Sequence, residues 1–199
     1  MRISVILAHP SQKSFNAALA RTVVKTLKKN RHQVIFHDLY AERFDPILPA
    51  PEIPEKAKLP AQIEKHCAEI ARAQGLIIVH PNWWSQPPAI LKGWIDRVLR
   101  EGLAYDFPPG PGGAAGQPIE LLGHIHTALV LNTSDTPKTR EERVLKDPLQ
   151  NIWKNTLSYC GVKRFYRRIF RVVVTSTSQE RIVWLDEAAA ITRRLFPPV

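Results

Sequence analysis

Residues 75–80 read Gly-Leu-Ile-Ile-Val-His, an apolar run that predicts a central β-strand buried on both faces. Residues 81–87 then read Pro-Asn-Trp-Trp-Ser-Gln-Pro, which predicts a loop. Residues 88–100 read Pro-Ala-Ile-Leu-Lys-Gly-Trp-Ile-Asp-Arg-Val-Leu-Arg and predict a helix, because proline is tolerated in its first turn. A strand followed by a loop and a helix is the unit from which parallel α/β sheets are built.

The same alternation continues through the rest of the chain. The other predicted strands are Arg2–Ala8, Gln33–Asp38, Thr127–Asn132 and Ile169–Thr175. The other predicted helices are Ser14–Asn30, Ile63–Gln74, Glu141–Tyr159 (interrupted near Pro148) and Ser178–Leu195. The remaining long segments predict a proline-rich ordered loop, Ala41–Pro60, and a glycine-rich flexible loop, Pro108–Gln117. We therefore expect a single α/β domain over residues 1–199, with five parallel strands in the doubly wound order 2-1-3-4-5 and helices on both faces.

Composition narrows the class of protein. Hydrophobic residues make up 44% of the chain, enough for a globular core. No apolar run approaches the roughly 20 residues of a membrane span, and the apolar start stops at His9-Pro10 without a cleavage signal, so we expect a cytoplasmic protein. Cys67 and Cys160 imply no disulfide framework. The net charge of +10 favours acidic partners such as nucleic acid, anionic lipid or phosphorylated cofactors.

Three predicted loops fall at the carboxyl ends of neighbouring strands, where ligands bind in doubly wound sheets. The first covers residues 9–16 and reads His-Pro-Ser-Gln-Lys-Ser-Phe-Asn. Its hydroxyls, its lysine and the N–H groups that open the next helix suit a phosphate dianion. The alternative is that Ser14 only caps the helix and that His9 is a surface histidine.

The second and third loops add an aromatic and a polar surface. In the second loop, residues 80–88, Trp83 and Trp84 are costly to expose, and a flat aromatic ligand would stack on them. The alternative is that one tryptophan packs in the core and the other covers the end of the sheet. The third loop, residues 132–137, reads Asn-Thr-Ser-Asp-Thr-Pro, and its alternative role is a turn that caps the next segment.

These stretches resemble the flavodoxin-like NAD(P)H:quinone oxidoreductases. That family includes mammalian quinone reductases, bacterial modulator-of-drug-activity reductases and the ancillary subunits of glutathione-gated potassium efflux systems. The resemblance is dense over residues 1–107 and thin beyond them. Its matching stretches are residues 9–16, 38–40, 44–46, 81–84, 88–98, 102–107 and 159–161.

The resemblance implies a flavin site, an electron donor, an acceptor and an assembly. FMN is favoured over FAD, because no adenine-binding extension is evident. NADH or NADPH would be the electron donor, and a quinone or a similar small molecule would be the electron acceptor. The protein would form a homodimer. Positions that match the family's phosphate and ribityl contacts are His9, Ser14, Phe15 and Asn16. Positions that match the loop along the isoalloxazine ring are Pro81, Asn82, Trp83, Trp84 and Ser85.

The third loop departs from the family pattern. The family has Thr-Thr-Gly-Gly where this chain has Asn132-Thr133-Ser134-Asp135, and we expect these four residues to contact the cofactor. A carboxylate replaces a glycine, so Asp135 either opposes the negative charge of reduced flavin or caps the following turn. The family's catalytic tyrosine and histidine have no clear match, and no catalytic residue is assigned.

Other functions remain as alternatives at this stage. One is a flavin-binding regulatory subunit of a membrane potassium-efflux system with little turnover. Another is nucleic-acid binding by residues 164–171, which interleave basic and aromatic side chains. We expect these residues instead to form an edge strand with a solvated basic face, and we expect no nucleic-acid partner. An anionic membrane is a further candidate contact for the arginines. His66-Cys67 and His124-x-His126 lack zinc spacing, so no metal site is expected. Trp94 and Ile95 are adjacent on one helix, which predicts a dimer contact for one of them.

Overall fold

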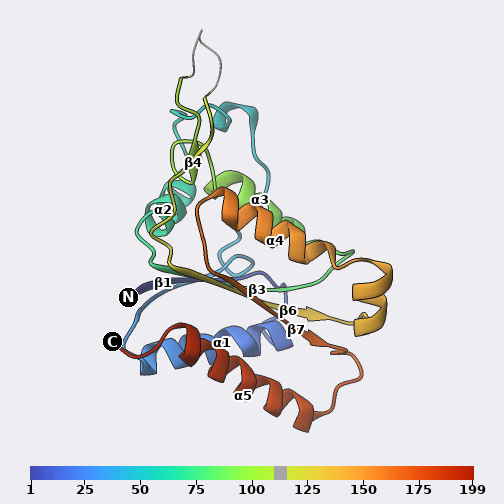
Figure 1. Ribbon diagram of the computed structural model, residues 1–199. Coiled ribbons are helices and arrows are strands. Elements are labelled where there is room, and N and C mark those ends of the chain that lie inside the picture. The colour runs from blue at the N-terminus through green and yellow to red at the C-terminus, as the bar shows by residue number, and fades with distance from the viewer. Residues whose placement is uncertain (110–115) are drawn as a thin grey trace.

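The computed structural model describes residues 1–109 and 116–199. Its main sheet has five parallel strands in the order β2-β1-β3-β6-β7, which is the predicted order 2-1-3-4-5 (Figure 1). The strands are β1 (Arg2–Leu7), β2 (Gln33–Asp38), β3 (Gly75–Pro81), β6 (Thr127–Ser134) and β7 (Phe165–Arg171). Every residue of β3 and of β6 is buried, because both strands lie inside the sheet with helices over each face.

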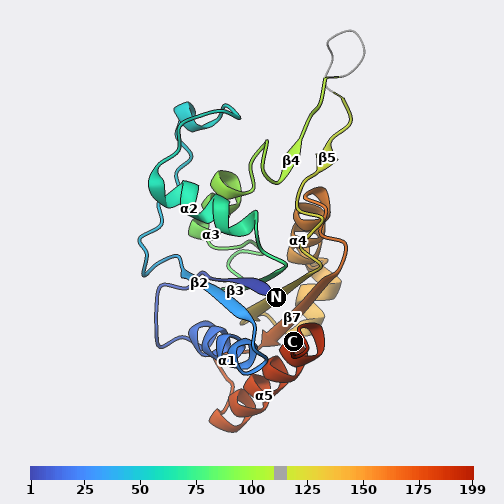
Figure 2. The same ribbon diagram turned by 90° about the vertical axis from the view of Figure 1, so that its left-hand side faces the viewer.

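The helices form two layers around the sheet (Figure 2). Helices α1 (Phe15–Lys29) and α5 (Ser178–Leu195) cover one face. Helices α2 (Ala61–Ile70), α3 (Ala89–Val98) and α4 (Pro148–Tyr159) cover the other. Each layer buries its own hydrophobic cluster against the sheet. The first residues of two helices follow sequence signals, since Ser14 caps α1 and Thr177 forms a capping box with Glu180 at α5.

The proline-rich segment from Ala41 to Pro60 is an ordered crossing segment, as its composition predicts. It contains the short 3-10 helix η1 (Ala50–Glu52). Buried Arg97 of α3 donates to the Glu52 carboxylate at 2.6 Å, which ties the segment to the helix. Gly93 permits the close approach, because a Cβ there would lie 2.2 Å from the Pro46 carbonyl oxygen.

Two expectations about the strands are wrong, and one element was not predicted. The last strand spans Phe165–Arg171 rather than Ile169–Thr175, because the arginine-rich stretch is itself the edge strand. Strand β6 runs to Ser134 rather than Asn132, so Thr133 and Ser134 also belong to the sheet and not to a loop. A small antiparallel pair, β4 (Tyr105–Asp106) and β5 (Ile119–Glu120), flanks the predicted flexible loop, of which residues 110–115 lie outside the described residues.

The premise of the dimer prediction, that Trp94 and Ile95 cannot face the same core, is also wrong. Trp94 is buried, and its indole N–H donates to His66 Nδ1 at 3.1 Å. Ile95 is partly buried and packs against the same hydrophobic cluster. Both side chains therefore serve one core. A further short helical turn, η3 (Arg140–Val144), precedes α4, as the predicted interruption near Pro148 suggests. Among the described residues, no helix has both the length and the apolar character that a bilayer crossing needs.

Candidate cofactor-binding site

Strand register brings the predicted loops together at one edge of the sheet. Leu7 at the end of β1 lies opposite Val79, and Pro81 at the end of β3 lies opposite Thr133. A cavity of about 340 Å³ opens there. Its lining includes His9, Ser14, Phe15 and Asn16 from the first loop, Pro81, Asn82 and Trp83 from the second, and Thr133, Ser134 and Asp135 from the third.

Three predicted residues do not line this cavity. Asn132 is fully buried within β6. Trp84 is 98% exposed, and Ser85 next to it shares its left-handed backbone conformation. Thr136 and Val173 line the cavity, although sequence reasoning did not select them. Val173 lies just beyond β7, so the misplaced final strand concealed it.

The start of α1 offers donors for an anion. The Ser14 hydroxyl accepts from the Ala17 N–H at 3.1 Å, while the N–H groups of Phe15 and Asn16 have no acceptor within the helix. The first turn carries no acidic side chain. His9 Nδ1 accepts from the Ser11 N–H at 3.0 Å, which places the ring proton on Nε2. Partial burial lowers the pKa of His9, so this histidine acts as a neutral donor.

Two residues that line the cavity, Asn16 and Asn82, each have a buried amide oxygen without a partner among the described residues. Asn16 Nδ2 donates to the Thr133 hydroxyl at 2.8 Å, and Asn82 Nδ2 donates to Glu141 at 2.7 Å. The Oδ1 atom of each asparagine is buried and has no hydrogen-bond partner among the described residues. Leaving a buried acceptor unsatisfied costs about 1–3 kcal/mol. A ligand with N–H or O–H donors would satisfy both atoms.

Asn82 is held by a buried ion pair that sequence reasoning missed. Glu141 is 1% exposed and accepts from Asn82 on one oxygen. Its other oxygen accepts from Arg171 Nε at 3.1 Å. The pair joins η3 and β7 to the second loop, and no local pattern marks Glu141 for this role.

A histidine beneath the second loop fixes the Pro81 carbonyl. His80 Nδ1–H donates to the Pro81 oxygen at 2.8 Å, and His80 Nε2 accepts from Trp153 at 2.9 Å and from Asn132 at 2.6 Å. Burial, with Arg167 nearby, lowers the pKa of His80 to about 3, so the ring is neutral. Asn132 therefore supports the loop from below and does not contact the cavity.

The basic stretch of β7 is largely neutralised within the fold. Arg167 pairs with Asp147 at 2.8 Å, and Arg168 pairs with Glu187 at 2.6 Å. A groove of about 740 Å³ runs along these side chains, but Glu142 and Asp147 line it together with the arginines. The stretch is an edge strand, as expected, and its cations mostly face carboxylates rather than solvent.

Three side chains outside the cavity could form a metal site by proximity. His37, Glu42 and His66 offer ligand atoms within 4.8 Å of one another, so His66 groups with distant residues and not with Cys67. The Trp94 indole donates to His66 Nδ1, which leaves the His66 proton on Nε2, facing Glu42 at 3.2 Å. Both nitrogens of His37 face carboxylates, of Glu42 and Glu69. Every ring nitrogen of His37 and His66 therefore already has a hydrogen-bond partner, which favours hydrogen bonding within this cluster over a metal ion.

Fold and site together define a doubly wound α/β protein with a cavity at the carboxyl ends of its strands, whose lining suits an anionic, hydrogen-bonding ligand. The chain belongs to the flavodoxin-like fold family, whose family model matches residues 1–190.

Relatives and solved structures agree with this membership. The chain is 30% identical over 193 residues to an uncharacterized NAD(P)H oxidoreductase of Haemophilus influenzae, covering 95% of this chain and 93% of that protein. It is 30% identical over 205 residues to mouse ribosyldihydronicotinamide dehydrogenase [quinone], covering 92% and 87%. An NAD(P)H:quinone oxidoreductase from Methanothermobacter marburgensis superposes with a TM-score of 0.82 at 27% identity, covering 98% and 96%.

Proposed function

We propose that this protein is a flavin-dependent NAD(P)H oxidoreductase that reduces quinones or similar small acceptors by two-electron hydride transfer. The observation that carries the proposal is the cavity itself. It combines free N–H groups of a helix N-terminus with two unpartnered buried amide oxygens at the edge where such sheets bind ligands. The relatives' names support the same reaction class. No contact or cavity among the described residues favours a regulatory subunit or a nucleic-acid-binding module.

The residues present suit a flavin nucleotide. The N–H groups of Phe15 and Asn16, with His9 Nε2–H, would hold the phosphate. The Oδ1 atoms of Asn16 and Asn82 would accept from ribityl hydroxyls or from the ring N–H. Trp83 and Pro81 would cover an aromatic ring. A bound flavin supplies the redox chemistry, because it accepts hydride from a nicotinamide and delivers two electrons to an acceptor.

We propose FMN rather than FAD as the cofactor. The cavity of about 340 Å³ is near the lower end of the size range for small-molecule sites, which suits the smaller flavin. NADH and NADPH both remain candidate donors, because no residue of the cavity distinguishes them.

We propose that the chain folds as one domain and acts as a homodimer in the cytoplasm. Both hydrophobic clusters pack on faces of the same sheet, which supports one domain over residues 1–199. Trp84 is 98% exposed beside half-exposed Trp83, and a second copy would cover this aromatic surface. Cys67 and Cys160 are buried free thiols, which suits a reducing compartment.

The absorption spectrum of the purified protein tests the central proposal. We expect flavin absorption bands, and mass measurement of the cofactor released by denaturation should match FMN. Addition of NADH or NADPH should bleach the bands, and a quinone should restore them. A protein that binds no flavin when either flavin is supplied in excess would contradict the proposal.

A further inference from the structure

Four exposed cations lie on α1 and a fifth follows it. This helix has no acidic residue, and Arg21, Lys25, Lys28 and Lys29 are exposed along it. Arg31 follows its C-terminus and is also exposed. We call these five residues the basic α1 face. Among the described residues, no Asp or Glu forms an ion pair with any of them.

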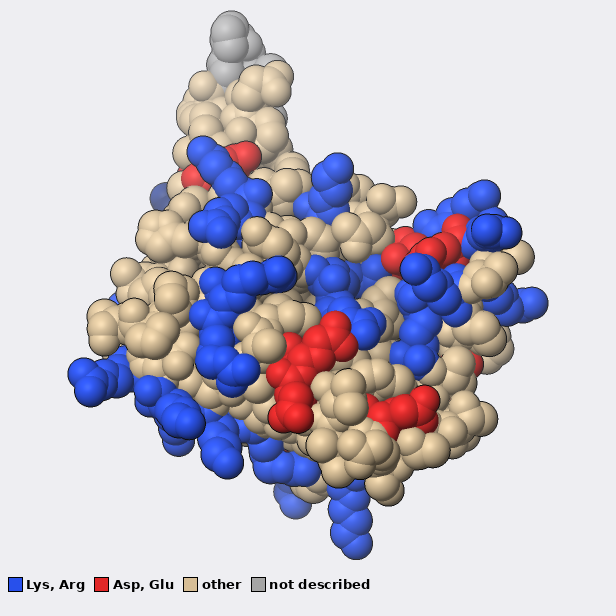
Figure 3. Space-filling model, turned by 60° about the horizontal axis from the view of Figure 1, so that its bottom comes forward, with Lys and Arg blue, Asp and Glu red and all other residues tan. Residues whose placement is uncertain are grey.

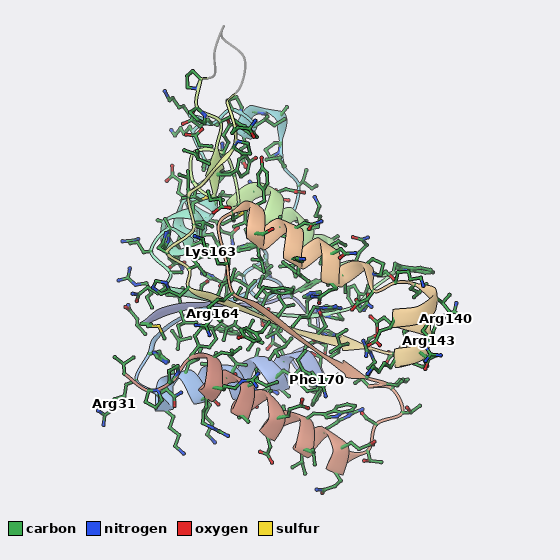
Figure 4. The ribbon with its side chains drawn as sticks, viewed as in Figure 1. Arg31, Arg140, Arg143, Lys163, Arg164 and Phe170 are labelled. Atoms are coloured by element: carbon green, nitrogen blue, oxygen red, sulfur yellow. The ribbon has the colours of Figure 1, made fainter. Side chains whose placement is uncertain are left out.

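Helical spacing places three of these charged side chains on the same side of α1. Arg21, Lys25 and Lys28 are separated by four and three residues, so they share one side of the helix. Figure 3 shows Lys and Arg side chains gathered along the lower edge of the surface formed by α1 and α5, with a smaller acidic group nearer its centre. Figure 4 shows Arg31 at the edge of the molecule, away from the sheet. Asp186 of α5 lies in the groove between the helices with Lys25 and Lys29, and it offsets part of the charge there.

An apolar hollow lies among the cations. Phe36 of the edge strand β2 is 42% exposed. With Val24 it lines a shallow hollow of about 340 Å³, whose other walls are the side chains of Arg21, Lys25 and Lys28. The aliphatic stems of these three residues extend the apolar surface, while their charged ends can reach outward.

The combination of exposed cations with an apolar hollow favours an acidic lipid bilayer over nucleic acid as the partner. A nucleic-acid duplex offers phosphates but no apolar phase for Phe36 and the aliphatic stems. The surface of a bilayer offers both, since acidic headgroups attract the cations and the acyl boundary accepts the aromatic ring. The face also lies on the α1–α5 layer, whereas exposed Trp84 follows β3 at the edge of the cavity.

We propose that the basic α1 face, with Phe36 at its centre, docks this protein onto lipid bilayers that carry acidic headgroups. The contact is peripheral and reversible. It extends the proposed function without resting on it, because neither the cavity nor a flavin takes part.

Sedimentation with vesicles tests the docking surface. We expect the purified full-length protein to bind vesicles of phosphatidylserine with phosphatidylcholine and not vesicles of phosphatidylcholine alone. Raising the salt from about 0.1 M to about 1 M shortens the screening length from ~10 Å to ~3 Å and should release the protein. Each cation near an acidic membrane gives roughly a fivefold gain in partitioning, so Lys25→Gln with Lys28→Gln should lower binding about 25-fold. Phe36→Ser should also weaken it.

A matched variant removes the same charge elsewhere. Lys56 and Lys58 are exposed in the proline-rich crossing segment, on the other side of the sheet, and their double change to glutamine should leave vesicle binding within about twofold of the wild type. Equal losses in the two double variants, or no binding to acidic vesicles at low salt, would overturn the proposal. Binding of a duplex oligonucleotide in place of vesicles would also overturn it. Failure here would not affect the flavin spectrum, so it is distinguishable from failure of the proposed function.

Discussion

Asp135 accepts a hydrogen bond from the backbone N–H of Val174, with 2.8 Å between Oδ1 and the nitrogen. The carboxylate thus ties the end of β6 to the segment after β7 while still lining the cavity. The nearby turn is capped by another side chain, because the Ser134 hydroxyl accepts from the Thr136 N–H at 3.1 Å. Asp135 therefore does not cap the turn at Thr136, while its place in the cavity lining keeps the opposition to reduced flavin as a prediction.

Asp135→Asn should raise the midpoint potential of the bound flavin by tens of millivolts. The amide oxygen can still accept from Val174, so the fold is kept while a negative charge leaves the cavity. For a two-electron couple, 30 mV corresponds to about 1.4 kcal/mol. Spectroelectrochemical titration measures the change, and an unchanged or lower potential would show that the carboxylate does not sense the flavin. Asp135→Ala removes the hydrogen bond as well and should lower stability by about 1 kcal/mol.

Asn16→Asp should weaken flavin binding. Asn16 is buried at the start of α1, where a new carboxylate would face the phosphate. Two unit charges roughly 6 Å apart at an effective dielectric near 20 repel enough for about a 100-fold loss of affinity. Fluorescence titration with FMN checks this, with Asn155→Asp on the exposed side of α4 as the control of equal charge. Similar affinities in both variants would remove Asn16 from the phosphate site.

His37 should make stability depend on pH. Burial alone lowers the pKa of His37, but Glu42 and Glu69 outweigh burial and raise it above 6.5. Stability from the charged ring is complete below pH 6.5 and is lost as pH rises through the raised value. Burial opposes ionisation of Glu42, yet His37 and His66 lower the pKa of Glu42 to about 2, so its contribution is complete above 4.5 and is lost toward pH 2.

Urea unfolding across a pH series checks this behaviour. The wild type should lose stability from pH 6.5 upward, and His37→Gln should flatten that decline. His124 is exposed, and His124→Gln should leave the decline in place. A wild-type curve that rises with pH over this range would contradict the assignment.

Steady-state kinetics should show a shared binding place for donor and acceptor. The cavity has a volume of about 340 Å³, which leaves little room for two substrates beside a flavin. We expect parallel double-reciprocal lines when NAD(P)H and quinone are varied together. Intersecting lines would indicate separate sites.

Trp84→Ser should weaken self-association. A tryptophan that is almost fully exposed in one chain is a strong candidate for the centre of an interface, where its loss costs at least ~2 kcal/mol, or about 30-fold in dimer affinity. Sedimentation velocity at micromolar concentration measures the shift. Ile182→Ser removes a half-exposed apolar side chain from α5 and should leave the dimer intact. A monomeric wild type would contradict the proposed homodimer.

The local sequence pattern was enough for the class and the order of the fold. The apolar run at Gly75–His80 and the cap at Ser14 depend on neighbours a few residues away, so they are readable without a structure. The same reasoning misplaced β7, because an arginine-rich edge strand lacks the apolar pattern of an inner strand.

Only the tertiary structure decided how the site is held. The sequence determined which three loops reach one edge of the sheet, since parallel strands end together. The pairing of Asn82 with Glu141, of His80 with Pro81 and Trp153, and of Asp135 with Val174 joins segments whose approach depends on strand register and layer packing. The oxygens of Asn16 and Asn82 lack partners because the packing of the described residues brings no donor to them. Such contacts form across long sequence separations, and no local periodicity encodes them.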